Sequence, residues 1–256
     1  MALRTRLLIA GLGVGLAVGL LVLFLALRPG ETPFAQAMQH VDGENLKLGV
    51  KIDAREKDEI MRLNGTALQN ADGTHSRFDV DAVYEEGDDP VRQTFLLIER
   101  DIWVGGDATE GVLPEGKRWL RSEEPETSPL LLNMRRLAIL LARTSEVEEK
   151  GTTTIRGQQA THYQGIVDVK AIAESEGEMA EDAYAARLGK EALVLPVELW
   201  VGEDGRPVRV ALKSAFGGNR LSYTADVLEY GPKVLVQTPP SDETITEAEF
   251  DRLTAE

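Results

Sequence analysis

Residues 195–212, LPVELWVGEDGRPVRVAL, carry the clearest structural signal in the sequence. Every second side chain on either side of an Asp-Gly pair is apolar: Val197, Leu199 and Val201 precede the pair, and Val208, Val210 and Leu212 follow it. Alternation with a period of two places one face of a strand against a core, and an Asp-Gly pair favours a tight turn. The segment therefore predicts an antiparallel hairpin with one buried face.

The same alternation extends outward from this hairpin in both directions. It recurs in residues 46–52, 61–67 and 76–82 before the hairpin, and in residues 221–227 and 234–236 after it. Residues 91–98 are apolar on both sides, which is typical of a strand that is covered on both faces. The runs between residues 46 and 98 have short connections and predict an antiparallel meander. Short helices are expected at residues 34–40 and 246–253.

Residues 129–143 differ from the strands around them. Ser128 and Pro129 predict a helix start, with the serine as cap and the proline at the first helical position. The residues that follow, LLLNMRRLAILLAR, are apolar around most of the helix circumference. Such a helix is covered on more than one side or borders an apolar cavity. Packing against the sheet without any ligand explains the pattern equally well.

Leucine and methionine side chains on this helix offer a flexible apolar surface that suits acyl chains. Trp103 and Trp119 lie on either side of an acidic, glycine-containing loop. They either border the same cavity or fill the core. The candidate residues for an apolar binding cavity are Leu130, Leu131, Met134, Leu137, Ala138, Leu141, Trp103 and Trp119.

Three segments together resemble a known family. They are IRGQQATHY at residues 155–163, LPVELWVGEDGRPV at residues 195–208, and YGPKV at residues 230–234 with the Pro239-Pro240 pair after it. This succession resembles the LolA/LppX-LprAFG-like group of bacterial envelope proteins, over about residues 33–240 in element order. The resemblance implies an α+β fold in which a strongly curved antiparallel sheet, a half-barrel, has helices packed on its concave face. It also implies that the apolar space between sheet and helices accepts acyl chains of lipids or lipoproteins.

The N-terminal region predicts a membrane anchor. Residues 7–27 contain no charge, and a helix of this length crosses about 30 Å of hydrocarbon. A cleaved secretory signal is the alternative, but its apolar region usually runs about 7–15 residues. We therefore expect a cytoplasmic N-terminus (residues 1–6), a single-pass signal anchor in the cell membrane (residues 7–27), a linker (residues 28–33) and an extracytoplasmic domain (residues 34–256).

The anchor also contains Gly11, Gly15 and Gly19, which are spaced by four residues. This spacing places three glycines on one helix face, where two copies could approach closely to form a homodimer. Glycine is also simply common in membrane helices, which explains the spacing without a dimer.

Charge and cysteine content exclude several classes of function. The formal net charge is −15, and this excess of negative charge repels nucleic-acid phosphates, so we expect no nucleic-acid partner. The sequence has no cysteine. It therefore has no disulfide, no catalytic thiol, no thiolate metal site and no lipid-modified N-terminal cysteine.

No motif supports an enzyme, a cofactor or a metal site. His162 is expected to be a strand histidine with a local hydrogen bond, because His40 and His75 do not have ligand spacing with it. His75, Asp79 and Asp81 share one strand face, but Arg77 lies among them and favours a solvated face. We therefore predict a membrane-anchored extracytoplasmic domain that binds lipid or an acylated protein. The alternative is a protein-interaction or sensor domain with a filled core.

Overall fold

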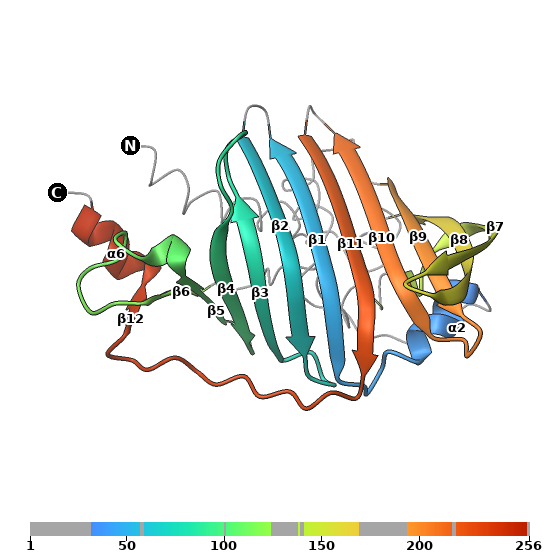
Figure 1. Cartoon of the computed structure of the whole chain (residues 1–256), viewed down its shortest axis with the longest axis horizontal. Coiled ribbons are helices and arrows are strands. Elements are labelled where there is room, and N and C mark those ends of the chain that lie inside the picture. The colour runs from blue at the N-terminus through green and yellow to red at the C-terminus, as the bar shows by residue number, and fades with distance from the viewer. Residues whose placement is uncertain are drawn as a thin grey trace, which may run out of the picture.

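The computed structural model describes residues 32–56, 59–99, 101–123, 138, 141–168, 194–216 and 219–254. Within these residues, twelve strands form one open sheet (Figure 1). The strands are β1 (Leu46–Glu56), β2 (Glu59–Gln69), β3 (His75–Val83), β4 (Val91–Ile98), β5 (Asp101–Gly106), β6 (Trp119–Glu123), β7 (Ser145–Ile155), β8 (Gln158–Asp168), β9 (Val194–Gly202), β10 (Pro207–Phe216), β11 (Asn219–Tyr230) and β12 (Thr244–Thr246).

Two meanders are joined at the centre of the sheet. The strand order is β12-β6-β5-β4-β3-β2-β1-β11-β10-β9-β8-β7, so β1 pairs with β11 although most of the chain separates them. The predicted first meander and the hairpin at residues 195–212, which forms β9 and β10, are both confirmed. The sheet is not purely antiparallel, however, because β12 pairs with β6 in parallel.

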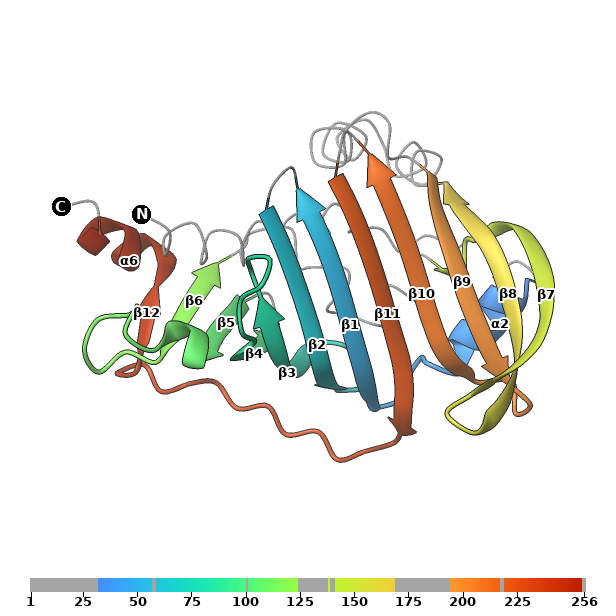
Figure 2. The ribbon, with the colours of Figure 1, turned by 45° about the horizontal axis from the view of Figure 1, so that its top comes forward.

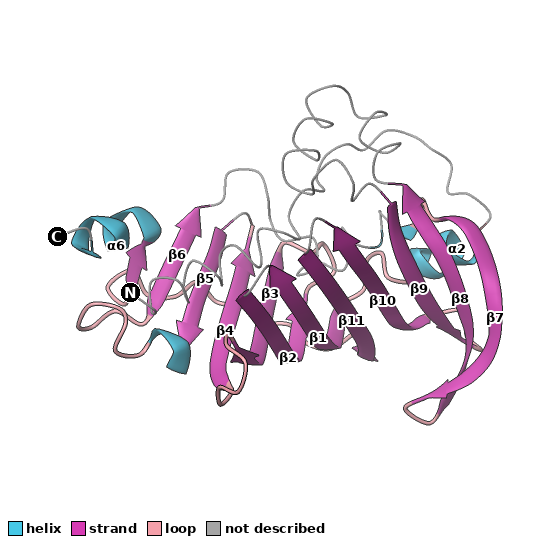
Figure 3. Cartoon of the chain, turned by 90° about the horizontal axis from the view of Figure 1, so that it is seen from above, coloured by secondary structure: helices cyan, strands magenta, loops and turns pink. Residues whose placement is uncertain are grey.

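The sheet is strongly curved, and its concave face holds the main hydrophobic core (Figures 2 and 3). Helix α2 (Pro33–Gln39) lies on this face beside β8 and β9 (Figure 2). Thr32 caps the helix, because its Oγ1 accepts a hydrogen bond from the Ala35 N–H at 3.2 Å. Phe34 and Met38 on α2 are buried in the main core. The short helices expected near both ends of the domain are confirmed as α2 and α6 (Glu247–Thr254).

Strand β4 is covered on both faces, as its sequence predicts. Phe95 and Leu97 belong to the main core on the concave face. Leu96 and Ile98 point the opposite way and pack with Trp103 in a second cluster on the convex face. Successive side chains of a strand alternate between faces, so a continuous apolar run requires cover on both sides.

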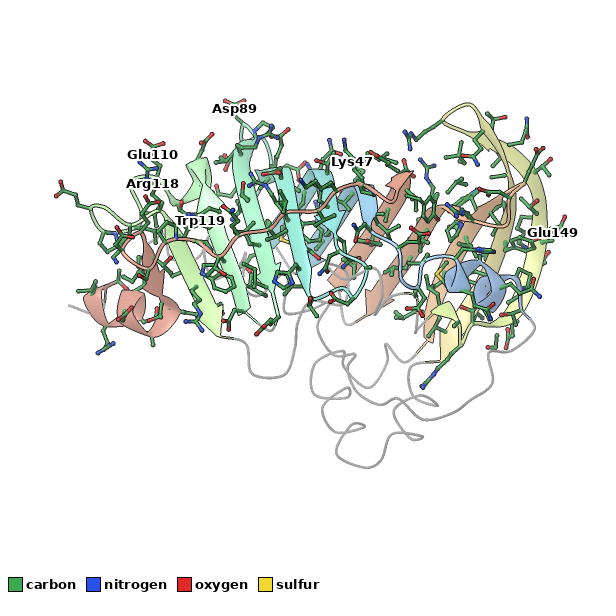
Figure 4. The ribbon with its side chains drawn as sticks, turned by 90° about the horizontal axis from the view of Figure 1, so that it is seen from below. Lys47, Asp89, Glu110, Arg118, Trp119 and Glu149 are labelled. Carbon is green, nitrogen blue, oxygen red and sulfur yellow. The ribbon has the colours of Figure 1, made fainter. Side chains whose placement is uncertain are left out.

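The strand predicted at residues 234–236 is wrong. The chain from Gly231 to Pro240 passes along the ends of the strands without joining the sheet, and it leads from β11 to β12 (Figures 1 and 4). Pro232, Pro239 and Pro240 lack the backbone N–H that a strand ladder needs. Strand β7 forms instead at residues 145–155, which the sequence analysis does not assign to a strand.

Among the described residues, no helix combines the length and apolar character that membrane crossing requires. The predicted anchor at residues 7–27, with Gly11, Gly15 and Gly19, lies outside the described residues, as do residues 1–6 and 28–31.

Candidate functional site

The concave face carries continuous rows of apolar side chains. Residues paired across antiparallel strands point to the same face, so the strand register identifies each row. The first row crosses β3, β2, β1, β11, β10 and β9 through Ala82, Leu63, Ile52, Tyr223, Leu212 and Val197. None of these side chains is more than 4% exposed. The row therefore forms a buried apolar band across the centre of the sheet.

A second row runs parallel to the first, two residues along each strand. It crosses the same strands through Val80, Gly65, Val50, Ala225, Val210 and Leu199. The five side chains of this row are at most 3% exposed. The buried apolar lining of the concave face thus extends both along and across the strands.

The end of the helix predicted at residues 129–143 contacts this face. Ala138 and Leu141 belong to the main core, at 7% and 0% exposed. Thr144 ends the segment and donates a hydrogen bond from Oγ1 to the Leu141 carbonyl at 2.6 Å. Thr144 also lies over β8, because a Cβ built on Gly165 would be 2.3 Å from its Cγ2. The other candidate residues of this segment, Leu130, Leu131, Met134 and Leu137, lie outside the described residues.

Trp103 and Trp119 lie on the other face of the sheet. Ile102 and Val104 occupy the concave positions of β5, so Trp103 between them points to the convex side. There it packs with Leu96 and Ile98, and Trp119 packs against the same cluster. The structure therefore does not bring the two tryptophans together with Ala138 and Leu141, because alternation along β5 separates them.

Trp119 is held over a glycine. Its ring lies so close to Gly105 that a Cβ at that position would be 2.7 Å from the ring, and Figure 4 shows Trp119 on β6 near the passing segment 231–240. The Arg121 guanidinium lies 5.6 Å from the centre of the Trp103 ring and pairs with Asp101 at 2.8 Å. These contacts give the two tryptophans a packing role on the convex face.

A hollow of about 310 Å³ lies beside this cluster, where β6 meets β12. Its charged lining residues already have partners. Lys117 Nζ donates to the carbonyls of Asp242 and Thr244 at 2.8 Å each. Glu249 accepts hydrogen bonds from the Thr246 backbone N–H and hydroxyl, which hold its pKa below the usual value. These partners give the hollow a structural role, in joining the C-terminal strand and helix to the sheet.

Buried polar side chains on the concave face differ in whether they have a hydrogen-bond partner. Gln69 Nε2 donates to Ser76 Oγ at 3.1 Å, and the Tyr84 hydroxyl donates to Gln93 Oε1. Tyr223 is 1% exposed and has no hydrogen-bond partner among the described residues. Burial raises the pKa of Tyr223, so its hydroxyl is protonated and available as a donor at neutral pH. Alternation in residues 221–227 predicts that Tyr223 is on the buried face of its strand, but nothing in the sequence singles out its hydroxyl.

His162 and His75 are held by structural contacts. His162 lies in β8, as predicted, but its partner is on the neighbouring strand: Nε2 lies 3.0 Å from Glu198 Oε2. Its ring also stacks on Trp200, with ring centres 4.3 Å apart. His75 Nδ1 lies 2.8 Å from Thr74 Oγ1. In the part of the chain that the structure describes, no three acidic or histidine side chains are grouped so that they could hold a metal ion.

Asp79, the acidic residue near the middle of the predicted solvated face, has two partners. Arg77 donates two hydrogen bonds to it, at 2.8 and 2.9 Å, and Thr94 Oγ1 donates a third at 2.9 Å. Both Arg77 and Thr94 lower the pKa of Asp79. Arg77 and Asp79 remain partly exposed, which agrees with the predicted solvated face, and the structure adds that they form an ion pair.

Comparison with known proteins supports the fold. No protein-family model matches the sequence, and no curated protein matches it either. LprF from Mycobacterium bovis is similar in structure, with a TM-score of 0.51 and 12% identity over 81% of this chain and 95% of LprF. The lipoprotein LppX from Mycobacterium tuberculosis has a TM-score of 0.44 and 14% identity over 80% of this chain and 96% of LppX. The likeness to LprF concerns the fold, and at that level it confirms the resemblance of this chain to the LolA/LppX-LprAFG-like group.

Proposed function

We propose that this chain is an extracytoplasmic domain that binds an apolar ligand, a lipid or the acyl chain of a lipoprotein, at the concave face of its sheet. We expect the ligand to contact the residues of the two apolar rows, together with Ala138, Leu141 and the rest of the 129–143 segment. Anchoring through residues 7–27 would keep the domain at one membrane. A tethered domain of this kind can hand over a lipid near that membrane but cannot diffuse between two.

The observation that carries the proposal is the extent of the apolar face. Its two rows continue from β3 to β9 and contain no charged side chain. Tyr223 is the single residue in the rows that has a polar side-chain atom. Binding sites for acyl ligands are lined mainly by such side chains, with few polar groups among them. The fold shared with LprF and the acyl-binding space implied by the resemblance support the same function.

Photocrosslinking in cell membranes tests the proposal on the full chain. Cells that produce it are fed a fatty acid carrying a diazirine in its chain, and ultraviolet light then attaches nearby acyl chains to the protein. Peptide mass spectrometry locates the attachment sites. We expect label at inward-facing positions of β9, β10 and β11, such as Val197 and Leu212, in addition to label from surrounding lipid in residues 7–27.

A pair of neighbouring substitutions provides the matched control. Ala225→Phe places a ring on the concave face, whereas Thr224→Phe places the same ring on the convex face of the same strand. Ala225→Phe should reduce label in the domain and Thr224→Phe should not. If Ala225→Phe does not fold by circular dichroism, Ala225→Val replaces it.

Label confined to residues 7–27 would overturn the proposal. That outcome would favour the alternative from the sequence, a protein-interaction or sensor domain whose core is filled by its own side chains. Label on the convex face alone would also contradict acyl binding at the concave face.

A further inference from the structure

We propose that the Tyr223 hydroxyl donates a hydrogen bond to the carbonyl oxygen of an ester-linked acyl chain. This inference rests on the proposed function and narrows it, because it selects acyl esters over bare hydrocarbons and ether lipids. The ester would lie on the concave face near the centre of β11, with the hydrocarbon chain along the apolar rows.

Among the described residues, none offers the Tyr223 hydroxyl an acceptor. Ile52 on β1 and Leu212 on β10 flank Tyr223 in the strand register. The inward neighbours along its own strand are Leu221 and Ala225. All four side chains are hydrocarbon, and Tyr223 is among the largest fully buried side chains of the described residues.

A buried hydroxyl without a partner lowers stability, because folding removes its hydrogen bonds to water and supplies none in return. Phenylalanine would fill nearly the same space without that cost. Native proteins pair the great majority of their buried polar groups, so an exception needs an explanation. A ligand that accepts a hydrogen bond from this hydroxyl would explain the exception.

Tyr84, which is also buried, and Tyr230, which is half-buried, both have acceptors. The Tyr84 hydroxyl is bonded to Gln93 Oε1 on the same concave face. The Tyr230 hydroxyl donates to the Pro207 carbonyl at 2.7 Å. Tyr223 therefore differs from both because its hydroxyl has no acceptor among the described residues, and a bound ligand could supply that acceptor.

The chemistry of the site favours an ester carbonyl as the acceptor. The two apolar rows contain no cation to balance a phosphate or a carboxylate, and burial of an unpaired anion is strongly unfavourable. An ester carbonyl is neutral, accepts one hydrogen bond readily and is attached directly to hydrocarbon. It therefore matches both the single donor and the apolar surface around it.

A matched pair of lipid probes tests the inference. One probe is a phosphatidylcholine with two ester-linked palmitoyl chains, and the other is its ether analogue with two hexadecyl chains, which lacks both carbonyl oxygens. Both are titrated by competition against a fluorescent phosphatidylcholine bound to the purified full chain in detergent. Because a neutral hydrogen bond contributes about 0.5–1.5 kcal/mol, the wild type should bind the ester probe about 2- to 12-fold more tightly than the ether probe.

Tyr223→Phe should remove this preference by weakening the ester probe to the level of the ether probe, with the ether probe unchanged. It should also raise the unfolding midpoint of the ligand-free protein, a result that does not depend on any probe. Tyr84→Phe is the control, because it deletes another buried hydroxyl on the same face, one whose acceptor is already Gln93. It should lower the unfolding midpoint and keep the preference for the ester.

The outcomes separate the two proposals. Equal binding of both probes by the wild type would overturn the role of Tyr223 while leaving acyl binding intact. An ester preference that persists in Tyr223→Phe would overturn it as well. Binding of neither probe, together with no acyl label on the concave face, would overturn the proposed function itself.

Discussion

Gly65 allows β3 to approach β2 closely, and Gly65→Ala should therefore destabilise the domain. A Cβ built at this position would be 2.1 Å from the Asp79 carbonyl oxygen and 2.6 Å from Val80 Cα. Ordinary contacts of a Cβ begin near 3.4 Å, so the two strands would have to separate by more than an ångström. Both obstructing atoms belong to the backbone of β3 and cannot turn aside as a side chain can.

The expected loss follows from two opposing effects. Forcing an extra carbon into a packed site costs about 1–3 kcal/mol, whereas replacing glycine by alanine reduces the entropy of the unfolded chain and stabilises by about 0.4–1 kcal/mol. Because backbone obstructs the new carbon, we expect the upper part of the first range, for a net destabilisation of about 2 kcal/mol. For a domain of this size, that corresponds to a fall of about 4–8 °C in the unfolding midpoint.

Gly49→Ala on β1 is the matched control. Its Cβ would meet Leu228 Cδ2 at 3.4 Å, an ordinary contact with a flexible side chain. We expect this variant to be unchanged or stabilised by up to about 1 kcal/mol. Thermal unfolding of the full chain in detergent, followed by circular dichroism, measures both variants. Equal midpoints for Gly65→Ala and Gly49→Ala would refute the argument that Gly65 sets the approach of β3.

Three further substitutions probe other parts of the sheet. Gly105→Ala should displace the Trp119 ring, because the new Cβ would collide with it. The variant should lose about 1–3 kcal/mol of stability, and its tryptophan emission should shift to longer wavelength. An unshifted spectrum would contradict the close packing of Trp119 on Gly105. Leu199→Ala removes a fully buried side chain and should cost about 2–5 kcal/mol in urea unfolding, whereas a smaller loss would mean that the face there is loosely packed. Because Arg77 lowers the pKa of Asp79, the stabilisation from this pair is present above about pH 4 and is lost as pH falls through the lowered pKa. As the pH falls below about 4, the free energy of unfolding of Asp79→Asn should therefore decrease less than that of the wild type. Identical decreases in both proteins would refute the stabilising role of the Arg77–Asp79 pair.

Much of the sheet is predictable because the sequence expresses it locally. The hairpin of β9 and β10 has strict alternation and a turn at Asp204 and Gly205, whose φ is +79°, so neighbouring residues suffice to specify it. Strand β4 is equally clear, since the unbroken apolar run from Phe95 to Ile98 needs cover on both faces. What local patterns leave open is which distant elements supply that cover.

Strand β7 shows why other parts of the sheet were missed. It lies at the edge of the sheet, and nearly all of its side chains are exposed or half-buried, with Ile155 as the buried exception. An edge strand with polar side chains on both faces has no hydrophobic alternation to detect, and such charges are what protect an edge from further pairing. Strand β12 has three residues and pairs with β6 across a long sequence separation, which no local pattern reveals.

The candidate site is also only partly predictable from local sequence. Alternation along β11 predicts that Tyr223 is buried, because Leu221, Ala225 and Val227 recur at a period of two around it. Whether its hydroxyl has a partner depends on elements from distant parts of the sequence, of which β1 and β10 flank it in the sheet. For the two tryptophans, the sequence leaves open whether they border the cavity or pack in a core. The strand register decides this, because Trp103 on β5 faces the convex side and Trp119 packs against the same cluster.

Tyr223 therefore provides the sharpest distinction between a binding face and a filled core. In a core filled by its own side chains, phenylalanine at this position would be better, since it packs as well and leaves no hydroxyl unpaired. In a face completed by an acyl ester, tyrosine is better only while the ligand is bound, so the hydroxyl lowers the stability of the free protein and raises affinity for the ester. The two cases predict different effects of an added ester lipid on the difference in stability between the wild type and Tyr223→Phe. In the binding case, lipid reverses the order of the two unfolding midpoints, whereas in the filled-core case the variant remains the more stable protein at every lipid concentration.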